Sequence, residues 1–299
     1  MALTLYQERS RNVWKTAFLM AVFLAIVLGI GYFVSYYYQS PGILYVAVFF
    51  AVFMNIYSYW FSDRQVLSMT NARPASKEEF FDFYTVTENL SITAGIQMPK
   101  LYVIEDPSPN AFATGRNEKH AVVAATTGLL AMMNRSELEG VIAHELSHVR
   151  NRDILLMTVA VVLAGFIAII ADMFLRVSLW GGNRDDSERG GGVMLVVGIV
   201  ALILAPIAAQ LIQLAISRRR EFLADASGAL LTRYPEGLAS ALQKIEGYGR
   251  PMQKVSHATA HLFIGDPYAA KAGDWINRLF STHPPTEARI RALMGGTKE

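Results

Sequence analysis

The 299-residue chain has no cysteine and few charged residues. Without cysteine it can form no disulfide, use no cysteine nucleophile and offer no thiolate to zinc, so a metal site must use histidine and carboxylate side chains. Charged residues make up 17% of the chain, against about 25% in soluble domains, and 53% are hydrophobic. The net charge is only +2, and no basic tract interleaved with aromatic residues indicates a nucleic-acid partner. The composition favours a membrane protein.

Four long apolar runs account for this composition, at residues 16–38, 43–61, 154–170 and 193–216. A membrane-spanning helix needs about 20 residues, so the first two runs predict a transmembrane hairpin. A signal peptide is the alternative for the first run, but no small-residue cleavage site closes it. A buried hairpin of a soluble protein is the alternative for the last two, because Pro206, Gln210 and Gln213 interrupt the fourth. About four transmembrane helices are expected.

Basic residues predict which segments face the cytoplasm. Nearly all of them lie outside the loop 180–192, which holds only Arg184 and Arg189. Because cytoplasmic segments of membrane proteins are rich in Lys and Arg, both termini are expected in the cytoplasm and this loop outside. The predicted order is a cytoplasmic N-terminus (1–15), a membrane hairpin (16–61), the first part of a cytoplasmic lobe (62–153), a second membrane pair (154–216) and the rest of the lobe (217–299).

The polar segment 62–153 alternates helical and extended patterns. A helix over 76–94 is expected to end at Gly95. Strands are predicted at 101–104, 110–114 and 120–126, the last two as a hairpin around the turn 115–117. A further helix follows them, so the lobe is expected to be an α+β domain.

That further helix carries HELSH at residues 144–148, which has the form H-E-x-x-H. On a helix His144 and His148 lie on one face, where two imidazoles can bind one zinc ion. Glu145 can then act as general base towards water activated by the metal. Ser136 and Glu139 predict a capping box at the start of this helix. The alternative is an ordinary amphipathic helix with two exposed histidines.

A third zinc ligand has to come from elsewhere in the chain. Glu221 and Asp225 are spaced i, i+4 and lie one predicted membrane pair beyond HELSH, on the same side of the bilayer. One of them can bind the metal and the other can hydrogen-bond the free N–H of a ligand histidine. Alternatively, both pair with the arginines at 218–220 on a solvated helix.

The chain resembles the HtpX family of bacterial inner-membrane zinc endopeptidases, relatives of the CAAX prenyl endopeptidases. The resemblance covers the whole chain and includes HELSHVRNRD (144–153), RRREFLAD (218–225) and THPPTEAR (282–289). It departs mildly at Phe222, where a tyrosine is frequent. The resemblance implies a zincin-like metalloprotease lobe of the gluzincin type.

The resemblance also implies residue roles. His144, His148 and Glu221 would bind one Zn²⁺, Glu145 would be the base, and Asp225 would orient a ligand histidine, His144 being the expected one. Asn110, Ala111, Phe112 and Ala113 resemble the edge strand along which an extended substrate adds. His283 would stabilise the oxyanion; a surface helix cap is the alternative for it. His257 and His261 are also spaced i, i+4, but no glutamate of the H-E-x-x-H type lies between them, so no site is assigned to them.

The expected function is zinc-dependent hydrolysis of peptide bonds in misfolded membrane or membrane-adjacent proteins at the cytoplasmic face of the bacterial inner membrane. The alternatives are a CAAX-type prenyl-peptide protease, a non-catalytic membrane scaffold with a structural zinc, and a soluble metalloprotease with a helical bundle. The expected partners are polypeptide substrates and the lipid bilayer. A second copy of the chain and other membrane proteases are further candidate partners.

Overall fold

The structure, a computed structural model, describes residues 5–180, 218–253, 259–268 and 284–295. Its helices are α1 (Leu5–Tyr37), α2 (Pro41–Met69), α3 (Phe81–Ala94), α4 (Thr127–Met132), α5 (Arg135–Arg150), α6 (Asp153–Trp180), α8 (Arg218–Thr232), α9 (Pro235–Tyr248) and α11 (Thr286–Leu293). Its strands are β1 (Arg73–Pro74), β2 (Lys100–Ile104), β3 (Ala111–Thr114) and β4 (Val122–Thr126). Short 3₁₀ turns cover Glu118–His120 and Ala260–Leu262.

Two described helices are long and apolar enough to cross a membrane, namely Ser10–Tyr37 within α1 and the whole of α2. They form the predicted hairpin. Both helices extend beyond the apolar runs, because no proline or glycine interrupts residues 5–15 or 62–69. Helix α6 begins at Asp153, beside the predicted boundary, and is apolar over Asp153–Ile167. The fourth apolar run and residues 181–192 of the predicted external loop lie outside the described residues.

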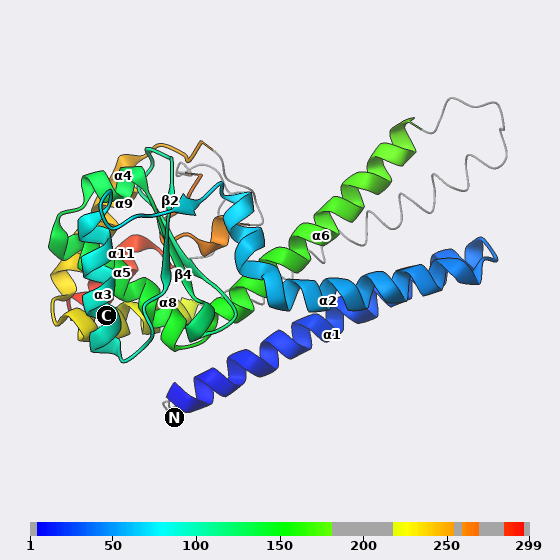
Figure 1. The fold of residues 1–299 in the computed structure, drawn as a ribbon, viewed down its shortest axis with the longest axis horizontal. Coiled ribbons are helices and arrows are strands. Elements are labelled where there is room, and N and C mark those ends of the chain that lie inside the picture. Colours follow the sequence, from blue (N-terminus) through cyan, green and yellow to red (C-terminus); the bar gives the residue numbers. More distant parts are fainter. Residues whose placement is uncertain (1–4, 181–217, 254–258, 269–283, 296–299) are drawn as a thin grey trace.

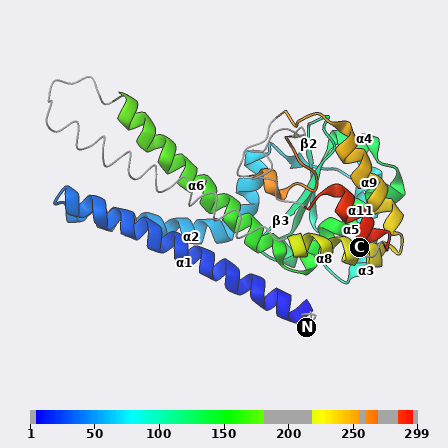
Figure 2. The ribbon, with the colours of Figure 1, turned by 180° about the vertical axis from the view of Figure 1, so that it is seen from behind.

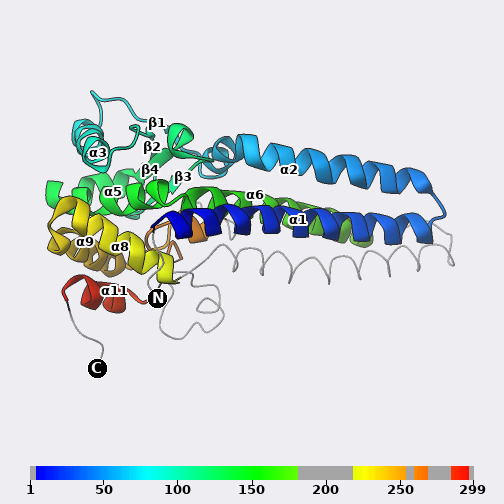
Figure 3. The ribbon, with the colours of Figure 1, turned by 90° about the horizontal axis from the view of Figure 1, so that it is seen from below.

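Helices α1, α2 and α6 leave the α/β lobe on one side and lie against one another (Figures 1 and 2). Leu19 and Phe23 of α1 pack with Leu156 and Leu163 of α6 in one buried apolar cluster. Figure 3 shows the N-terminal end of α1 close to the lobe, so α1 runs away from the lobe and α2 returns to it. The hairpin thus brings both of its polar ends to the same end of the molecule.

The lobe contains a four-stranded mixed sheet with the order β1-β2-β4-β3. Strand β4 is parallel to β2 and antiparallel to β3, which is the predicted hairpin, and β3 lies at one edge of the sheet, as the family resemblance implies. The Thr126 N–H donates to the Asn110 carbonyl at 2.9 Å. Because hydrogen-bonded and non-hydrogen-bonded pairs alternate along an antiparallel ladder, the backbone polar groups of Ala111 and Ala113 point to the free edge of β3.

Helix α5 packs between α3, α8 and α9 and against β3. Its apolar face is fully buried, with Leu138, Val141, Ile142 and Leu146 in the main core of the lobe. The Ser136 cap predicted for this helix is wrong: Asn134 accepts from the Glu137 N–H at 3.0 Å, and the Glu137 carboxylate accepts from the Asn134 N–H at 2.9 Å. The sequence contains two overlapping capping patterns, Asn134/Glu137 and Ser136/Glu139, which start two residues apart.

The Asn134–Glu137 cap is also stabilised by contacts with helix α9. Glu137 also accepts from Ser240 and Lys244 of α9, each at 2.7 Å, which favours the earlier start of α5. Helix α3 likewise begins at Phe81 rather than at residue 76, and it ends at Gly95 as predicted, with φ 66°. A glycine takes this left-handed conformation without steric cost.

Candidate active site

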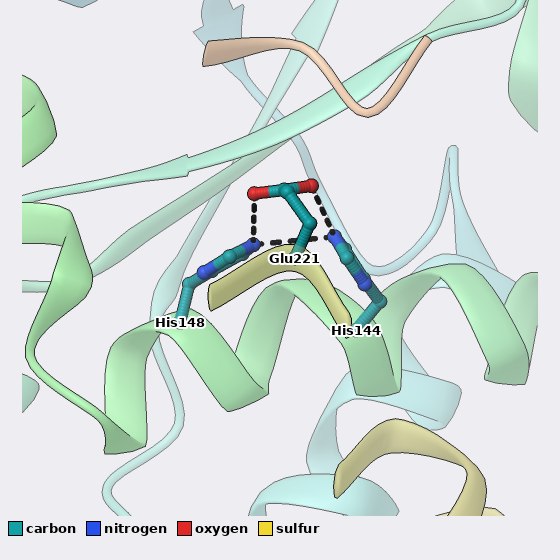
Figure 4. A group of neighbouring side chains, drawn as sticks. All are labelled: His144, His148 and Glu221. Atoms are coloured by element: carbon teal, nitrogen blue, oxygen red, sulfur yellow. Dashed lines mark hydrogen bonds and ion pairs between the residues drawn. The ribbon is translucent and has the colours of Figure 1, made fainter. Parts of the chain in front are cut away.

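Three side chains from two helices converge at one point (Figure 4). His144 and His148 come from α5 and Glu221 from α8, and all three are buried. The two histidine Nε2 atoms are 3.2 Å apart, and the Glu221 carboxylate oxygens lie 3.8 Å from His144 Nε2 and 3.6 Å from His148 Nε2. Among the described residues, this is the group of histidine and acidic side chains that could hold a metal ion.

The donor set fits zinc. At a tetrahedral zinc centre with bonds of about 2.0–2.2 Å, ligand atoms lie roughly 3.3–3.5 Å apart. The separations of 3.2–3.8 Å bracket this value, so an ion could be accommodated without moving the helices. Two imidazoles and one carboxylate leave a fourth position open, as in catalytic rather than structural zinc sites.

His144 is held by a buried carboxylate that itself has a cation partner. The Nδ1 atom of His144 lies 2.8 Å from the carboxylate of Asp225, one turn beyond Glu221 on α8. Arg289 of α11 donates to both oxygens of that carboxylate, at 2.9 and 2.7 Å, and to the Ile264 carbonyl at 3.1 Å. The pair orients the His144 ring with Nε2 towards the convergence point.

His148 is held by a different carboxylate. Its Nδ1 lies 3.2 Å from Asp153, the first residue of α6. Asp153 accepts from the Asn12 side-chain amide at 2.5 Å and lies 3.7 Å from Arg220 Nε. Both histidines therefore have Nδ1 beside a carboxylate, an arrangement that leaves Nε2 as the metal-binding atom.

The pKa values of the two histidines shift in opposite directions, because Arg289 lies beside His144 while acidic groups surround His148. Burial lowers the pKa of His144 to about 4 despite Asp225, since Arg289 offsets the charge of that carboxylate. Burial also opposes charge on His148, but the hydrogen bond to Asp153 and the negative charge of Glu221 raise its pKa to about 9. Asp225 itself is buried, and Arg289 lowers its pKa to about 2. Without a metal, His148 is therefore the protonated member of the pair at neutral pH.

Glu145, the predicted base, lies between α5 and the edge strand. Its side chain is buried, and the Ala113 backbone N–H donates to its carboxyl group. Burial raises the pKa of Glu145 to about 7, although this hydrogen bond and His148 favour the charged form. A carboxyl group poised near neutral pH can both accept and return a proton.

The predicted substrate strand is partly covered by a neighbouring segment. The Asn110 side chain bonds both the N–H and the carbonyl of Gly265, at 3.0 and 3.1 Å. The Ala111 carbonyl accepts from the Ile264 N–H at 2.9 Å. Phe112 is fully buried against Phe263, with ring centroids 5.2 Å apart. Ala113, beside Glu145, is thus the residue of the four that lies nearest the candidate chemistry.

A glycine sets the distance between the two ligand helices. A Cβ on Gly228 would lie 3.0 Å from the backbone nitrogen and 3.3 Å from the Cα of His144. Glu221, Asp225 and Gly228 share one face of α8, at i, i+4 and i+7. The absence of a side chain at Gly228 lets this face approach the backbone of α5, which brings the two acids to the histidines.

The structure brings together all the predicted metal-site residues and adds three that sequence reasoning missed. Asp153 and Arg289 are the last residues of the motifs HELSHVRNRD and THPPTEAR, so the motifs held the signal but no role was drawn from it. Asn12 carried no signal, because it stands alone in the polar start of an apolar helix. His283 and His257 lie outside the described residues, and His261 is buried and is not a member of the metal group.

The chain is similar to known peptidases. The model of peptidase family M48 matches residues 79–296. The chain is 46% identical to the protease HtpX homolog of Caldanaerobacter subterraneus subsp. tengcongensis over 97% of both chains. It is 50% identical to the protease HtpX homolog of Pyrococcus furiosus, covering 94% of this chain and 95% of that one.

A solved structure has a similar fold. The crystal structure of S. mikatae Ste24p superposes with a TM-score of 0.52 at 18% identity, over 92% of this chain and 62% of that one. At this identity the likeness concerns the fold alone. The family match and the HtpX relatives favour a protease over a non-catalytic scaffold, and the two long apolar helices favour a membrane protein over a soluble one. The chain belongs to peptidase family M48 and is a membrane-associated metalloprotease of the HtpX type.

Proposed function

We propose that the protein is a zinc-dependent endopeptidase, with one Zn²⁺ per chain held by His144, His148 and Glu221. The observation that carries the proposal is the convergence of two Nε2 atoms and a carboxylate at 3.2–3.8 Å beside the buried Glu145. Asp225 and Asp153 hold the two imidazoles in the orientation that metal binding requires.

Glu145 carries the proton transfer in this proposal. Zinc bound at the site supplies Lewis-acid chemistry, polarising the scissile carbonyl and making water more acidic. Glu145 accepts a proton from the attacking water and returns it to the leaving amine, so the proton balance of hydrolysis is closed by one residue. Its raised pKa supports this role, because a base near neutral pH can perform both transfers.

The substrate is proposed to bind as an extended strand on the free edge of β3. The outward-facing backbone of Ala113 supports this: its carbonyl is aligned for β-pairing, and its N–H, which donates to Glu145, places that carboxyl group beside the strand. Asn110 and Ala111 would take part once Ile264 and Gly265 move from the edge. His283 is proposed to stabilise the oxyanion.

The proposed substrates are misfolded membrane or membrane-adjacent proteins, cleaved at the cytoplasmic face of the inner membrane. Support comes from the position of the metal group, which lies on α5 and α8 close to where α1, α2 and α6 join the lobe. An active site at that position would lie close to the bilayer, where membrane or membrane-adjacent polypeptides could reach it. Four spans with both termini in the cytoplasm remain the proposed topology.

A Glu145→Gln variant tests the mechanism. It is expected to bind zinc with wild-type stoichiometry but not to cleave an unfolded membrane protein in detergent. Glu139→Gln is the matched control, because it makes the same change at a half-buried surface position of the same helix, where Glu139 pairs only with Arg135 among the contacts described. Removing zinc with 1,10-phenanthroline should abolish wild-type cleavage, and added zinc should restore it. If Glu145→Gln cleaves as fast as wild type, the proposed mechanism is wrong.

Topology can be tested with single cysteines, since the chain has none of its own. Ser187→Cys in the predicted external loop should react with a membrane-impermeant maleimide in intact cells. Glu78→Cys, exposed on the lobe, should react only after the membrane is opened. Labelling of Glu78→Cys from outside would contradict a cytoplasmic active site.

A further inference from the structure

Asn12, near the start of α1, is buried although most of its neighbours are exposed. Its side chain and backbone together are 1% exposed, whereas Ser10, Arg11 and Trp14 are exposed. The Asn12 amide nitrogen donates to Asp153 at 2.5 Å and to the Asn151 carbonyl at 3.3 Å. A buried polar side chain costs free energy unless it is hydrogen-bonded. The amide nitrogen makes both of these bonds, whereas the Asn12 carbonyl oxygen has no hydrogen-bond partner among the described residues, so the bond to Asp153 is the feature of this buried amide that reaches the metal group.

Asn12 begins the face of α1 that packs on the rest of the molecule. Thr16, Leu19 and Phe23 continue this face at helical spacing, and each is at most 2% exposed. The face is apolar where it contacts the middle of α6 and polar only at the end that reaches Asp153. Asparagine therefore stands where α1 meets the acid at the start of α6.

Asp153 connects this asparagine to the metal group. One carboxylate oxygen accepts from Asn12 and the other faces His148 Nδ1 at 3.2 Å. A hydrogen bond to the first oxygen restrains the rotation of the carboxylate, and this favours the orientation in which the second oxygen faces the imidazole. Because Asn12 is neutral, it does this without adding a second positive charge to that of Arg220, whose Nε lies 3.7 Å from the same oxygen of Asp153.

We propose that Asn12 is a positioning residue of the metal site, through which the first membrane helix controls how tightly His148 binds zinc. The inference rests on the proposed zinc site. It assigns to α1 a role beyond anchoring: the site is completed only when the membrane hairpin is docked against α6. Loss of the Asn12 hydrogen bond leaves Asp153 able to rotate, so His148 presents Nε2 less often in the binding orientation.

The test measures zinc affinity of the full-length protein in detergent micelles, by competition with a chelator of known affinity. Asn12→Leu removes the donor while keeping the number and branching of the side-chain heavy atoms and giving good helix propensity. It should weaken zinc binding about tenfold, the lower end of the effect of outer-shell changes. Asn55→Leu is the matched control, because the Asn55 amide donates to the Ala51 carbonyl within α2 and lies in the same hairpin. Its zinc affinity should equal that of wild type.

A double-mutant comparison separates positioning from general damage. In an Asp153→Ala background, Asn12→Leu should cause no further loss of affinity, because its effect passes through that carboxylate. The inference is overturned if Asn12→Leu binds zinc like wild type, or if it weakens binding equally with and without Asp153. His148→Ala separates failure of the Asn12 inference from failure of the proposed zinc site. If this variant binds zinc as well as wild type, the proposed zinc site is wrong, and the Asn12 inference is wrong with it.

Discussion

Replacing Gly228 with alanine should separate the two helices that carry the metal group. The added Cβ would lie 3.0 Å from His144 N, 3.2 Å from the Ala143 carbonyl carbon and 3.3 Å from His144 Cα. All three are backbone atoms of α5, so no side chain can rotate away. Helix α8 has to move instead, and it carries Glu221 and Asp225 with it.

The size of the displacement decides the expected effect. Contacts of 3.0–3.3 Å are shorter than ordinary non-bonded packing at about 3.5–4.0 Å, so α8 must retreat by a few tenths of an ångström at Gly228. Metal sites hold their bond lengths within about 0.2 Å, so the shift exceeds what a zinc site absorbs without loss. Overpacking of this kind costs about 1–3 kcal/mol of unfolding free energy. We expect that destabilisation together with zinc affinity about tenfold weaker.

Thermal unfolding and chelator competition on the purified protein would measure both effects. Gly247→Ala is the matched control: it lies in α9, where a Cβ would meet no atom of the described residues within 4 Å. That variant should be unchanged or more stable by up to about 1 kcal/mol, the helix preference of alanine over glycine. If Gly228→Ala unfolds and binds zinc like Gly247→Ala, close helix approach does not set the site geometry.

Two further predictions concern the carboxylates behind the histidines. Arg289→Met leaves Asp225 buried without its cation and should lower the free energy of unfolding by about 3–5 kcal/mol, measured by thermal unfolding. Adding Asp225→Asn should recover part of this loss, because it removes the unpaired buried charge. His148 has a pKa raised to about 9 without metal, so below that pH a proton must leave before zinc binds. Calorimetry in buffers of different ionisation enthalpy should therefore show that about one proton is released per zinc bound at pH 7. The apparent affinity for zinc should rise with pH and become constant above about pH 9. Unchanged affinity between pH 7 and 9 would contradict the raised pKa, and equal stability of Arg289→Met and wild type would contradict the buried-charge argument.

Local patterns made part of this site predictable from sequence. His144, Glu145 and His148 follow a five-residue spacing, and Glu221 and Asp225 follow an i, i+4 spacing, so each set occupies one helix face wherever the helix lies. The helical hairpin and the pairing of β3 with β4 also follow from local signals, namely long apolar runs and two short strands around a turn. The edge position of β3 was expected from the family resemblance alone.

Partners joined across long sequence distances were not predictable in the same way. Asn12 and Asp153 are separated by 141 positions, and Arg289 and Asp225 by 64. No spacing rule pairs them, because the contacts exist only after α1 packs on α6 and α11 packs on α8. The predicted start of α5 was wrong for a related reason. Two capping patterns overlap in the sequence, and the contacts of Ser240 and Lys244 from α9 with Glu137 favour the earlier one.

The position of Arg289 in the chain has a consequence for how the enzyme is made. The ribosome releases the residues of the site in the order Asn12, HELSH, Asp153, Glu221 and Asp225, and Arg289 comes last. Until α11 is synthesised and packed, Asp225 has no guanidinium partner among its described contacts, and burying it beside His144 is costly. The carboxylate that holds His144 therefore gains its guanidinium partner only after all three proposed metal ligands have been synthesised.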